Sequence, residues 1–576
     1  MTKLRDSGLL SFSAFACMLL TLCVVTTIAS PAQVTFTPLA SFDGTDGRGP
    51  NLMTLTQGAD GIFYGTTVFG GTSELCFPGC GTVFKVSSVG TLTTLHSFCS
   101  QSNCSDGEEP VGTLVQDASN NFYGITSGGG SNPGGTVFKI TPAGVLTTVY
   151  SFCTLADCTD GQQPFAGLAQ SNKNGNFYGT TALGGVNGGG TVFQITPAGK
   201  LTTLYSFCAL ANCADGEEPV GTLVQARDGS FYGEASAGGI AGLGTAGCGT
   251  IFRITLAGKL TTLFTFDFTN GCGPSGGLIQ ANNGDFYGVT ASGGSGGLCQ
   301  ASENCGTAFK ITAAGELTTL HDFCTTVTCA DGAQPFGPLI QGTDGKLYGT
   351  TFGEFVPSTI FDITPSGYLA TLFTFGGTNG YEPTGGLLQA TSGFFYGTTF
   401  GGGSGGGYGT IFSLSTGLGP FVQTEPTSAK EGATIGIFGQ GFTSSSVVEF
   451  GGVQATSVKV PGTTFLTATV PVGALTGSVT VTTGGTTLTT NQEFHVTPQL
   501  LSFNPPSGPV GTQVTIAGAG FTQASGVGFG DTVPAEFTVN SDTEITATVP
   551  NGAQTGPIEV GTKGGTAISS ATFTVN

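Results

Sequence analysis

The residues best suited to chemistry in this sequence are acidic side chains that recur between β-like segments. Two stretches share one pattern, Asp106-Gly107-Glu108-Glu109 and Asp215-Gly216-Glu217-Glu218, and Asp160 and Asp331 stand at the corresponding places in two further copies. Carboxylates in such loops could bind a polar ligand, ligate calcium or, across two copies, act as the paired acids of glycoside cleavage. Eight residues are therefore candidate ligand-binding residues: Asp106, Glu108, Glu109, Asp160, Asp215, Glu217, Glu218 and Asp331.

Turn-forming Asp-Gly pairs with solvated acids explain these stretches as well as calcium does, so we expect no cofactor and keep calcium as the alternative. Residues 293–297 and 402–406 satisfy the Gly-x-Ser-x-Gly pattern of a hydrolase nucleophile, but neither has the required strand-to-helix setting. His96, His321 and His495 are the three histidines, and we interpret them as packing residues. No catalytic residue is therefore predicted.

Cysteines are numerous and mostly close neighbours in the chain. Cys17 and Cys23 lie in the apolar N-terminal stretch, which leaves an even number beyond it. An even count behind an export signal indicates disulfides rather than thiol chemistry. Zinc is the alternative for such spacings, but no histidine accompanies them, so we predict no metal site. The expected pairs are Cys76–Cys80, Cys99–Cys104, Cys153–Cys158, Cys208–Cys213, Cys248–Cys272, Cys299–Cys305 and Cys324–Cys329.

Composition limits the classes of protein that this chain can be. Glycine supplies 100 of the 576 residues, and charged residues are only 9%, where about 25% is ordinary. The glycines lack the strict third-residue period of collagen. A formal charge of −20 argues against nucleic acid or an anionic membrane as partner, because phosphate contacts require clustered Lys and Arg.

The elements that must carry the loops come from an internal repeat. Phe63-Tyr64-Gly65 recurs at intervals of 48 to 61 residues to give seven copies, of which the sixth reads Leu347-Tyr348-Gly349, and each copy is followed by a segment like Gly135-Thr136-Val137-Phe138-Lys139-Ile140. β-Branched and aromatic residues between Gly, Pro, Asn and Asp predict four short strands per unit. Seven four-stranded sheets are typical of a β-propeller.

The chain ends predict how the ring closes. A segment like residues 201–207 follows six of the units but is missing after the seventh, and its counterpart, residues 34–42, precedes the first unit. We therefore predict that residues 34–42 complete the last sheet; an open solenoid is the alternative and would need no such permutation. The same topology places all the predicted disulfides on one face of the ring, opposite the short Asp-Gly hairpins.

Four regions follow from these patterns. Residues 1–32, with Lys3, Arg5, an apolar stretch and a small-residue end, predict a cleaved secretory signal; an uncleaved anchor is the alternative, and a lipid-modified cysteine is disfavoured. Residues 33–418 are the predicted propeller. Residues 419–498 and 499–576 repeat each other at an offset of 79, and their short Val and Thr alternations predict two small β-sandwiches.

Two resemblances support this division. The stretch Pro505–Phe521 is similar to the IPT/TIG immunoglobulin-like family, and residues 420–498 resemble a more divergent copy. Residues 34–416 resemble the GloVer tandem repeats of bacterial exported proteins. The resemblance implies an exported or surface protein without established catalytic residues, so no active site is carried over.

The predicted fold is therefore all-β: a seven-bladed β-propeller closed by an N-terminal strand and followed by two immunoglobulin-like β-sandwiches. We expect an exported protein, secreted, periplasmic or at the cell surface, without a membrane span in the mature chain. The leading hypothesis is a noncatalytic binding or adhesion protein whose disulfide-stapled loop face binds a glycan or a surface protein. The alternatives are a secreted carbohydrate-active enzyme, hydrolase or lyase, and a purely structural envelope protein.

Overall fold

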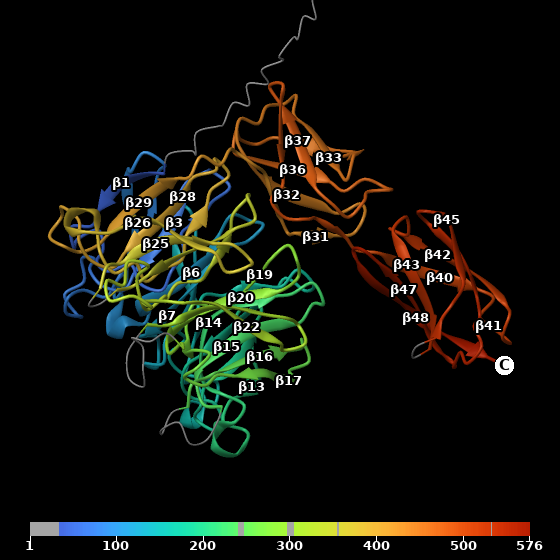
Figure 1. Cartoon of the computed structure of the whole chain (residues 1–576), viewed down its shortest axis with the longest axis horizontal. Helices are drawn as coiled ribbons and strands as arrows, with labels where there is room; N and C mark the ends of the chain where they lie inside the picture. Colours follow the sequence, from blue (N-terminus) through green and yellow to red (C-terminus); the bar gives the residue numbers. More distant parts are fainter. Residues whose placement is uncertain (1–33, 240–246, 296–304, 354–355, 531–532) are drawn as a thin grey trace, which may run out of the picture.

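The computed structural model describes residues 34–239, 247–295, 305–353, 356–530 and 533–576. Within these ranges the chain is built of strands and four single-turn 3-10 helices (Figure 1), and no helix there has the length and apolar character needed to cross a bilayer. The predicted signal segment, residues 1–32, lies outside the described residues. The all-β class is confirmed.

Seven antiparallel sheets occupy residues 35–415. In the first six sheets the strands follow chain order from the innermost strand outward, and in the seventh the N-terminal strand is added at the outer edge. The strands are, sheet by sheet, β2 (Thr56–Gln57), β3 (Phe63–Thr67), β4 (Thr82–Val86) and β5 (Leu92–Ser97); β6 (Glu108–Gln116), β7 (Phe122–Gly128), β8 (Thr136–Ile140) and β9 (Leu146–Ser151); β10 (Ala169–Gln170), β11 (Phe177–Thr181), β12 (Thr191–Ile195) and β13 (Leu201–Ser206); β14 (Glu217–Gln225), β15 (Phe231–Ala237), β16 (Thr250–Ile254) and β17 (Leu260–Thr265); β18 (Cys272–Pro274), β19 (Ile279–Gln280), β20 (Phe286–Ser292), β21 (Thr307–Ile311) and β22 (Leu317–Asp322); β23 (Ile340–Gln341), β24 (Leu347–Thr351), β25 (Thr359–Ile363) and β26 (Leu369–Thr374); and β27 (Leu388–Gln389), β28 (Phe395–Thr399), β29 (Thr410–Ser415) and β1 (Thr35–Ser41). The 3-10 helices lie in the crossovers between sheets: η1 (Ser102–Cys104), η2 (Ala156–Cys158), η3 (Ala211–Cys213) and η4 (Gly377–Asn379).

Strand β1 pairs antiparallel with β29, so the first described strand completes the sheet that the chain begins last. The register runs from Thr35 opposite Ser415 to Ser41 opposite Thr410, with an irregularity after Pro38. Phe42, at the end of β1, is fully buried and packs edge-on against Phe84 of the first sheet. The predicted pairing of residues 34–42 with the last sheet is therefore confirmed.

The repeated Phe-Tyr-Gly motif joins each sheet to the next. Each tyrosine ring lies against the phenylalanine of the following copy, as in Tyr64–Phe122 with centroids 4.0 Å apart, and Tyr396 lies against Phe63 across the closure. In the sixth sheet Leu347 replaces this phenylalanine and packs in the same cluster as Tyr287. The motif is thus a contact between sheets, and its repetition follows from the repeated interface.

The glycine of the motif makes room for a phenylalanine of the neighbouring strand. A Cβ at Gly124 would lie 2.5 Å from the ring of Phe138, and the other six copies show the same contact at 2.5 to 2.7 Å. That ring in turn packs against the buried phenylalanine that ends the previous sheet, Phe98. Any larger residue than glycine would displace the ring because interiors are closely packed.

A glutamine at the end of six of the innermost strands ties neighbouring hairpins together. The backbone N–H of the hairpin residue in one sheet donates to the glutamine Oε1 of the next, as from Asn172 to Gln225 at 2.9 Å. The same bond crosses the closure, from Thr391 of the seventh sheet to Gln57 of the first at 3.1 Å. We call these glutamines the glutamine clasp: Gln57, Gln116, Gln225, Gln280, Gln341 and Gln389.

Residues 423–575 form two β-sandwich units with separate cores. The strands of the first are β30 (Gln423–Glu425), β31 (Ser428–Ala429), β32 (Thr434–Phe438), β33 (Val447–Phe450), β34 (Val453–Gln454), β35 (Val458–Lys459), β36 (Phe465–Thr469), β37 (Val479–Thr483), β38 (Thr486–Thr489) and β39 (His495–Val496). The strands of the second are β40 (Gln499–Asn504), β41 (Ser507–Gly508), β42 (Gln513–Ala519), β43 (Ala524–Phe529), β44 (Val533–Pro534), β45 (Phe537–Ser541), β46 (Glu544–Thr548), β47 (Gly556–Thr562) and β48 (Gly565–Val575).

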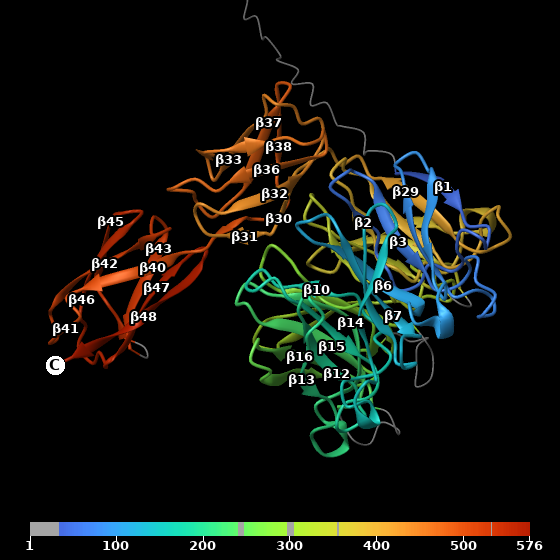
Figure 2. The same cartoon turned by 180° about the vertical axis from the view of Figure 1, so that it is seen from behind.

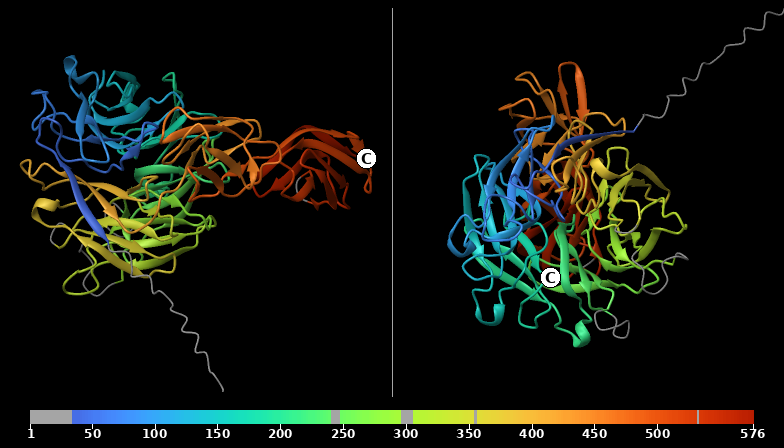
Figure 3. Two further views of the ribbon diagram at one scale, coloured as in Figure 1. Left: turned by 90° about the horizontal axis from the view of Figure 1, so that it is seen from above. Right: turned by 90° about the vertical axis from the view of Figure 1, so that its left-hand side faces the viewer.

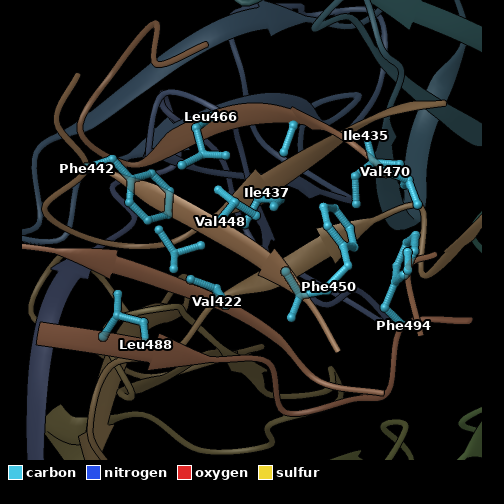
Figure 4. Packing of buried hydrophobic residues seen from close by; sticks show 14 of the residues in the cluster. Val422, Ile435, Ile437, Phe442, Val448, Phe450, Leu466, Val470, Leu488 and Phe494 are labelled. Atoms are coloured by element: carbon cyan, nitrogen blue, oxygen red, sulfur yellow. The ribbon is translucent and has the colours of Figure 1, made fainter. Parts of the chain in front are cut away.

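The two units are built alike, as the sequence offset of 79 predicts. Figure 4 shows the first core, where Phe450 lies close to Phe494 with ring centroids 5.2 Å apart. The equivalent rings of the second core, Phe529 and Phe573, are 5.1 Å apart. The alternation of buried and exposed residues in β32 and β42 gives each sheet one face in the core.

The first sandwich rests on the hairpin side of the ring. Asn172 Nδ2 donates to Ser428 Oγ at 3.0 Å, Thr464 Oγ1 donates to the Ala59 carbonyl at 3.2 Å, and Asn282 Nδ2 donates to the Asn491 carbonyl at 2.7 Å. Figure 2 shows β31 next to the hairpin ends of the sheets, and Figure 3 shows the second sandwich continuing away from the ring to the C-terminus. The opposite, crossover side of the ring is not covered by either sandwich.

Candidate functional site

A cavity of about 590 Å³ lies where the crossovers of all seven sheets reach the innermost strands. We call it the axial cavity. Its walls come from residues just after the crossover prolines and from residues just after the second strand of a sheet, which place it at the crossover side of the ring. The residues that line it include Asn51, Thr113, Phe165, Val220, Ser275, Phe336, Phe352, Glu382, Thr384 and Phe400. Most ligand pockets fall in this range of size.

Aromatic rings form much of the wall. Phe336 and Phe352 meet edge to face with centroids 5.5 Å apart, and Phe400 lies close to Gly49, where a Cβ would come within 2.9 Å of the ring. Phe165 comes from the third sheet and is 37% exposed. Exposed rings around a concavity offer flat apolar surface without a large loss of side-chain entropy on binding.

Polar groups are few and stand among these rings. The Leu52 N–H donates to Thr384 Oγ1 at 3.4 Å, and the Thr54 N–H donates to Thr113 Oγ1 at 3.1 Å. Glu382 is the charged residue of the lining, and its backbone has a φ of 57°, just before Pro383. An apolar lining with a small number of placed polar groups is typical of a binding site for an uncharged or weakly charged ligand.

A second carboxyl group lies behind the wall of the axial cavity. Glu234 is fully buried, and its Oε2 accepts a hydrogen bond of 2.9 Å from the N–H of Gly277, next to the lining residue Gly276. Burial raises the pKa of Glu234 to about 8, so the group is protonated at neutral pH. Its Oε1 has no hydrogen-bond partner among the described residues. The other six sheets carry Thr, Ile or Val here, and this difference between copies is the sequence signal that could have identified Glu234.

The four predicted aspartates hold their own loops instead of facing a cavity. Asp106 is buried and accepts bonds from His96 Nε2 at 3.1 Å and from Ser100 Oγ at 2.8 Å. Burial alone would raise the pKa of Asp106, but these hydrogen bonds outweigh it and keep the pKa below its ordinary value. Asp160 and Asp215 accept bonds of 2.8 Å from Tyr150 and Tyr205 in the same way.

Asp331 repeats this arrangement with His321, whose Nε2 lies 2.9 Å away. His96 and His321 do pack edge to face, on Phe98 and Phe323. Each also bonds to the loop aspartate ten residues later, a contact that was not predicted. The signal was present in the sequence: sheets with His or Tyr at this position carry Asp in the crossover, and the sheets with Phe264 and Phe373 carry Asn270 and Asn379.

The predicted glutamates occupy two different positions. Glu108 and Glu217 are half-buried at the start of their strands, and burial followed by the charge of Glu109 raises the pKa of Glu108. Glu109 and Glu218 are exposed and have positive φ before a proline, as Glu382 does. They are thus the counterparts of a residue that lines the axial cavity, although neither is itself part of its lining.

Six of the predicted cysteine pairs are disulfide-bonded in the structure. These are Cys76–Cys80, Cys99–Cys104, Cys153–Cys158, Cys208–Cys213, Cys248–Cys272 and Cys324–Cys329. Cys299, of the predicted pair Cys299–Cys305, lies outside the described residues. The sulfurs of the first two pairs cluster with Glu108 within 4.8 Å, but sulfur held in a disulfide lacks the thiolate that zinc requires.

The Gly-x-Ser-x-Gly serines lie in loops between strands. Ser295 Oγ donates to Asp322 Oδ2 at 2.6 Å, and Ser404 Oγ donates to Ser41 Oγ at 3.4 Å. Residues 296 and 297 lie outside the described residues. Neither serine bonds to a histidine among the described residues, so the geometry gives no support to a serine nucleophile.

Fold and cavity together define a repeat protein of the β-propeller type with appended β-sandwiches. The chain belongs to the Gloeobacter/Verrucomicrobia repeat family, whose model matches residues 24–174 and 299–437. The model of the IPT/TIG domain matches residues 498–575. Both agree with the resemblances drawn from the sequence. No curated protein shows significant sequence similarity to the chain.

Several solved structures show a distant likeness to the chain. A fungal alcohol oxidase of the AA5 family in complex with copper is 12% identical and covers 95% of this chain and 100% of its own, with a TM-score of 0.41. A luciferin-regenerating enzyme is 13% identical over 54% of this chain and 93% of its own, with a TM-score of 0.36. The surface glycan-binding protein PbSGBP-B from Prevotella bryantii is 20% identical over 27% of this chain and 39% of its own, with a TM-score of 0.21. These likenesses are too distant to carry an argument about activity.

Proposed function

We propose that this chain is an exported, noncatalytic binding protein: a seven-bladed propeller, residues 33–418, that binds a glycan in the axial cavity, carried by two immunoglobulin-like modules, residues 419–498 and 499–576. Residues 1–32 act in this proposal as the secretory signal. The mature protein is secreted, periplasmic or held at the cell surface.

The observation that carries the proposal is the axial cavity itself. All seven sheets contribute to it, and it combines the rings of Phe336, Phe352 and Phe165 with hydroxyl and amide groups. Sugars are recognised by such a combination, because their C–H faces stack on aromatic rings while their hydroxyls need hydrogen-bond partners. A rigid scaffold with variable loops at one end is also where binding residues concentrate.

The placement of the sandwiches agrees with this use of the ring. The first sandwich rests on the hairpin side, through contacts such as Asn172–Ser428 and Thr464–Ala59, and both sandwiches leave the crossover side open. Disulfides brace the crossovers, as Cys153–Cys158 and Cys208–Cys213 do. A short loop closed by a disulfide loses less conformational freedom when a ligand orders it.

The predicted glutamates enter the proposal according to their positions. Glu109 and Glu218, the counterparts of Glu382, would contact the parts of a glycan that extend beyond the cavity mouth. The crossover loops would be held in shape by four aspartates, Asp106, Asp160, Asp215 and Asp331, which would therefore act on the ligand only indirectly. Glu108 and Glu217, at the start of the strands that follow, would support the same loops.

A glycan array probed with the mature full-length chain tests the proposal. We expect saturable binding without turnover, and we expect Phe336→Ala with Phe352→Ala to weaken it at least tenfold. Phe394→Ala is the matched control, because Phe394 is 42% exposed in a hairpin at the other end of the ring. Binding that survives the double variant would refute the axial cavity as the site.

A carbohydrate-active enzyme is the second candidate, and Glu234 is the observation that favours it. A carboxyl group that stays protonated to a pH of about 8 has the property of a general acid. Turnover on a polysaccharide panel, abolished by Glu109→Gln, Glu218→Gln or Glu234→Gln, would establish the enzyme instead. Absence of both binding and turnover would favour a structural envelope protein.

A further inference from the structure

A second cavity, of about 400 Å³, lies on the hairpin side of the ring where the propeller and both sandwiches meet. We call it the junction cleft. Hairpins of the third, fourth and fifth sheets supply Asn172, Lys173, Arg227 and Asn282, the first sandwich supplies residues near His495, and the β47–β48 turn of the second supplies Lys563. It is separate from the axial cavity, which lies at the opposite end of the innermost strands.

Positive charge is concentrated in the junction cleft of an otherwise acidic protein. Lys173, Arg227 and Lys563 line it, whereas Glu493 is the carboxylate in its lining. The whole sequence has only 15 lysines and arginines against 35 acids. Chance alone rarely brings three of so few cations to one concavity, and their mutual repulsion is unfavourable unless an anion offsets it.

Polar contacts hold two of these cations, Arg227 and Lys563, in place in the cleft. Arg227 Nη2 donates to the Asn282 carbonyl at 3.1 Å, and Lys563 Nζ pairs with Glu493 Oε1 at 2.7 Å. Burial, followed by the charge of Arg227, lowers the pKa of His495. The hydrogen bond from Lys563 lowers the pKa of Glu493, to which the charges of His495 and Arg227 add. Side chains from the propeller and from both sandwiches therefore interact electrostatically in this cleft: Arg227, Glu493, His495 and Lys563.

Nearby acids do not neutralise this charge. Asp228, which follows Arg227, is paired with Arg253 at 2.8 Å and is not part of the lining. Glu493 can balance one of the three cations. The remaining surface consists of hydroxyl and amide side chains such as Thr427, Gln492 and Thr497, which suits a polar ligand with many hydroxyl groups and not an apolar one.

We propose that the junction cleft binds an acidic sugar, with its carboxylate held by Lys173, Arg227 and Lys563 and its hydroxyls by the surrounding amide and hydroxyl groups. Arginine fits a carboxylate because its planar fork donates two parallel hydrogen bonds. A ligand here would contact the ring and both sandwiches at once. It would therefore hold the two sandwiches at a fixed angle to the propeller. This site is independent of the axial cavity and of the function proposed for it.

Isothermal titration of the mature full-length chain tests the proposal, with trigalacturonate as the acidic probe, maltotriose as the neutral one and inorganic phosphate as the simple anion. We expect trigalacturonate to bind, its affinity to fall as salt is raised, and maltotriose not to bind. Equal affinity for phosphate and trigalacturonate would overturn the sugar specificity. Absence of trigalacturonate binding would overturn the site.

Variants locate the binding. Lys173→Gln combined with Arg227→Gln is expected to weaken trigalacturonate binding at least tenfold, while Lys200→Gln combined with Lys259→Gln, which removes the same number of charges from the exposed β12–β13 and β16–β17 turns, leaves it unchanged. A thermal melt of each variant checks that it is folded. Phe336→Ala with Phe352→Ala should not alter trigalacturonate binding, so failure of this site and failure of the axial cavity are distinguishable. Unchanged binding in the Lys173 and Arg227 double variant would refute the proposal.

Discussion

Because β1 closes the ring, we expect the change Phe42→Ala to lower the free energy of unfolding by a specific amount. Phe42 is fully buried and packs against Phe84 with centroids 5.2 Å apart. Replacing a buried phenylalanine by alanine costs about 3–5 kcal/mol, because contacts are lost and a cavity remains. Phe152 holds the equivalent position between the second and third sheets, with its ring 5.1 Å from that of Phe193. Both variants should therefore lose a similar amount of stability.

Guanidinium unfolding followed by far-ultraviolet circular dichroism measures this cost, since the chain has no tryptophan to report by fluorescence. Phe77→Ala is the control, because Phe77 is fully exposed and should leave the midpoint unchanged. A loss of less than about 1 kcal/mol for Phe42→Ala, beside the full loss for Phe152→Ala, would mean that β1 contributes little to the ring. That result would refute the closure argument.

Three further changes follow from named contacts. Glu234→Gln should remove a pH dependence of the free energy of unfolding. The raised pKa of Glu234 means that the folded state binds the proton more tightly than the unfolded state does. The stabilisation from this proton is therefore complete below a pH of about 4.5 and is lost as pH rises to about 8. Wild-type stability should fall by about 5 kcal/mol relative to the variant across that window, and parallel pH profiles from thermal melts would contradict it. Gly124→Ala should cost about 1–3 kcal/mol, because its Cβ meets the Phe138 ring; an unchanged denaturation midpoint would show that the ring moves freely. Leu347→Phe should restore the ring contact with Tyr287 that the other interfaces have and stabilise the fold by about 0.5–1.5 kcal/mol, whereas a lowered midpoint would show that the sixth interface is shaped for leucine.

The sequence predicted those features that recur in every unit. Six Phe-Tyr-Gly copies and one Leu-Tyr-Gly copy predicted the strand pattern, and the missing last strand led to the pairing of residues 34–42 with β29. The disulfide pairs followed from their short separations, and Cys248–Cys272 followed from their place in the topology. Each of these predictions depends on residues that are close in the chain or on comparing one repeat copy with another. A single sequence supplies both kinds of information.

The candidate site depended on features that differ between copies or arise only in three dimensions. Phe165, Phe336 and Glu382 come from three sheets, and only the closed ring brings them to one cavity. Asp106 looked like an exposed ligand because loop acids usually are, yet its bond to His96 buries it. The junction cleft joins hairpin residues to a turn more than 300 residues later, a relation fixed by how the sandwiches dock.

The axial cavity is tested most directly by a crystal structure of the full-length chain with a glycan that the array identifies. The account predicts electron density for the sugar between Phe165, Phe336 and Phe352, at the crossover side of the ring. A sugar bound on the outer surface of the sheets or on the sandwiches, with the axial cavity unchanged, would contradict it.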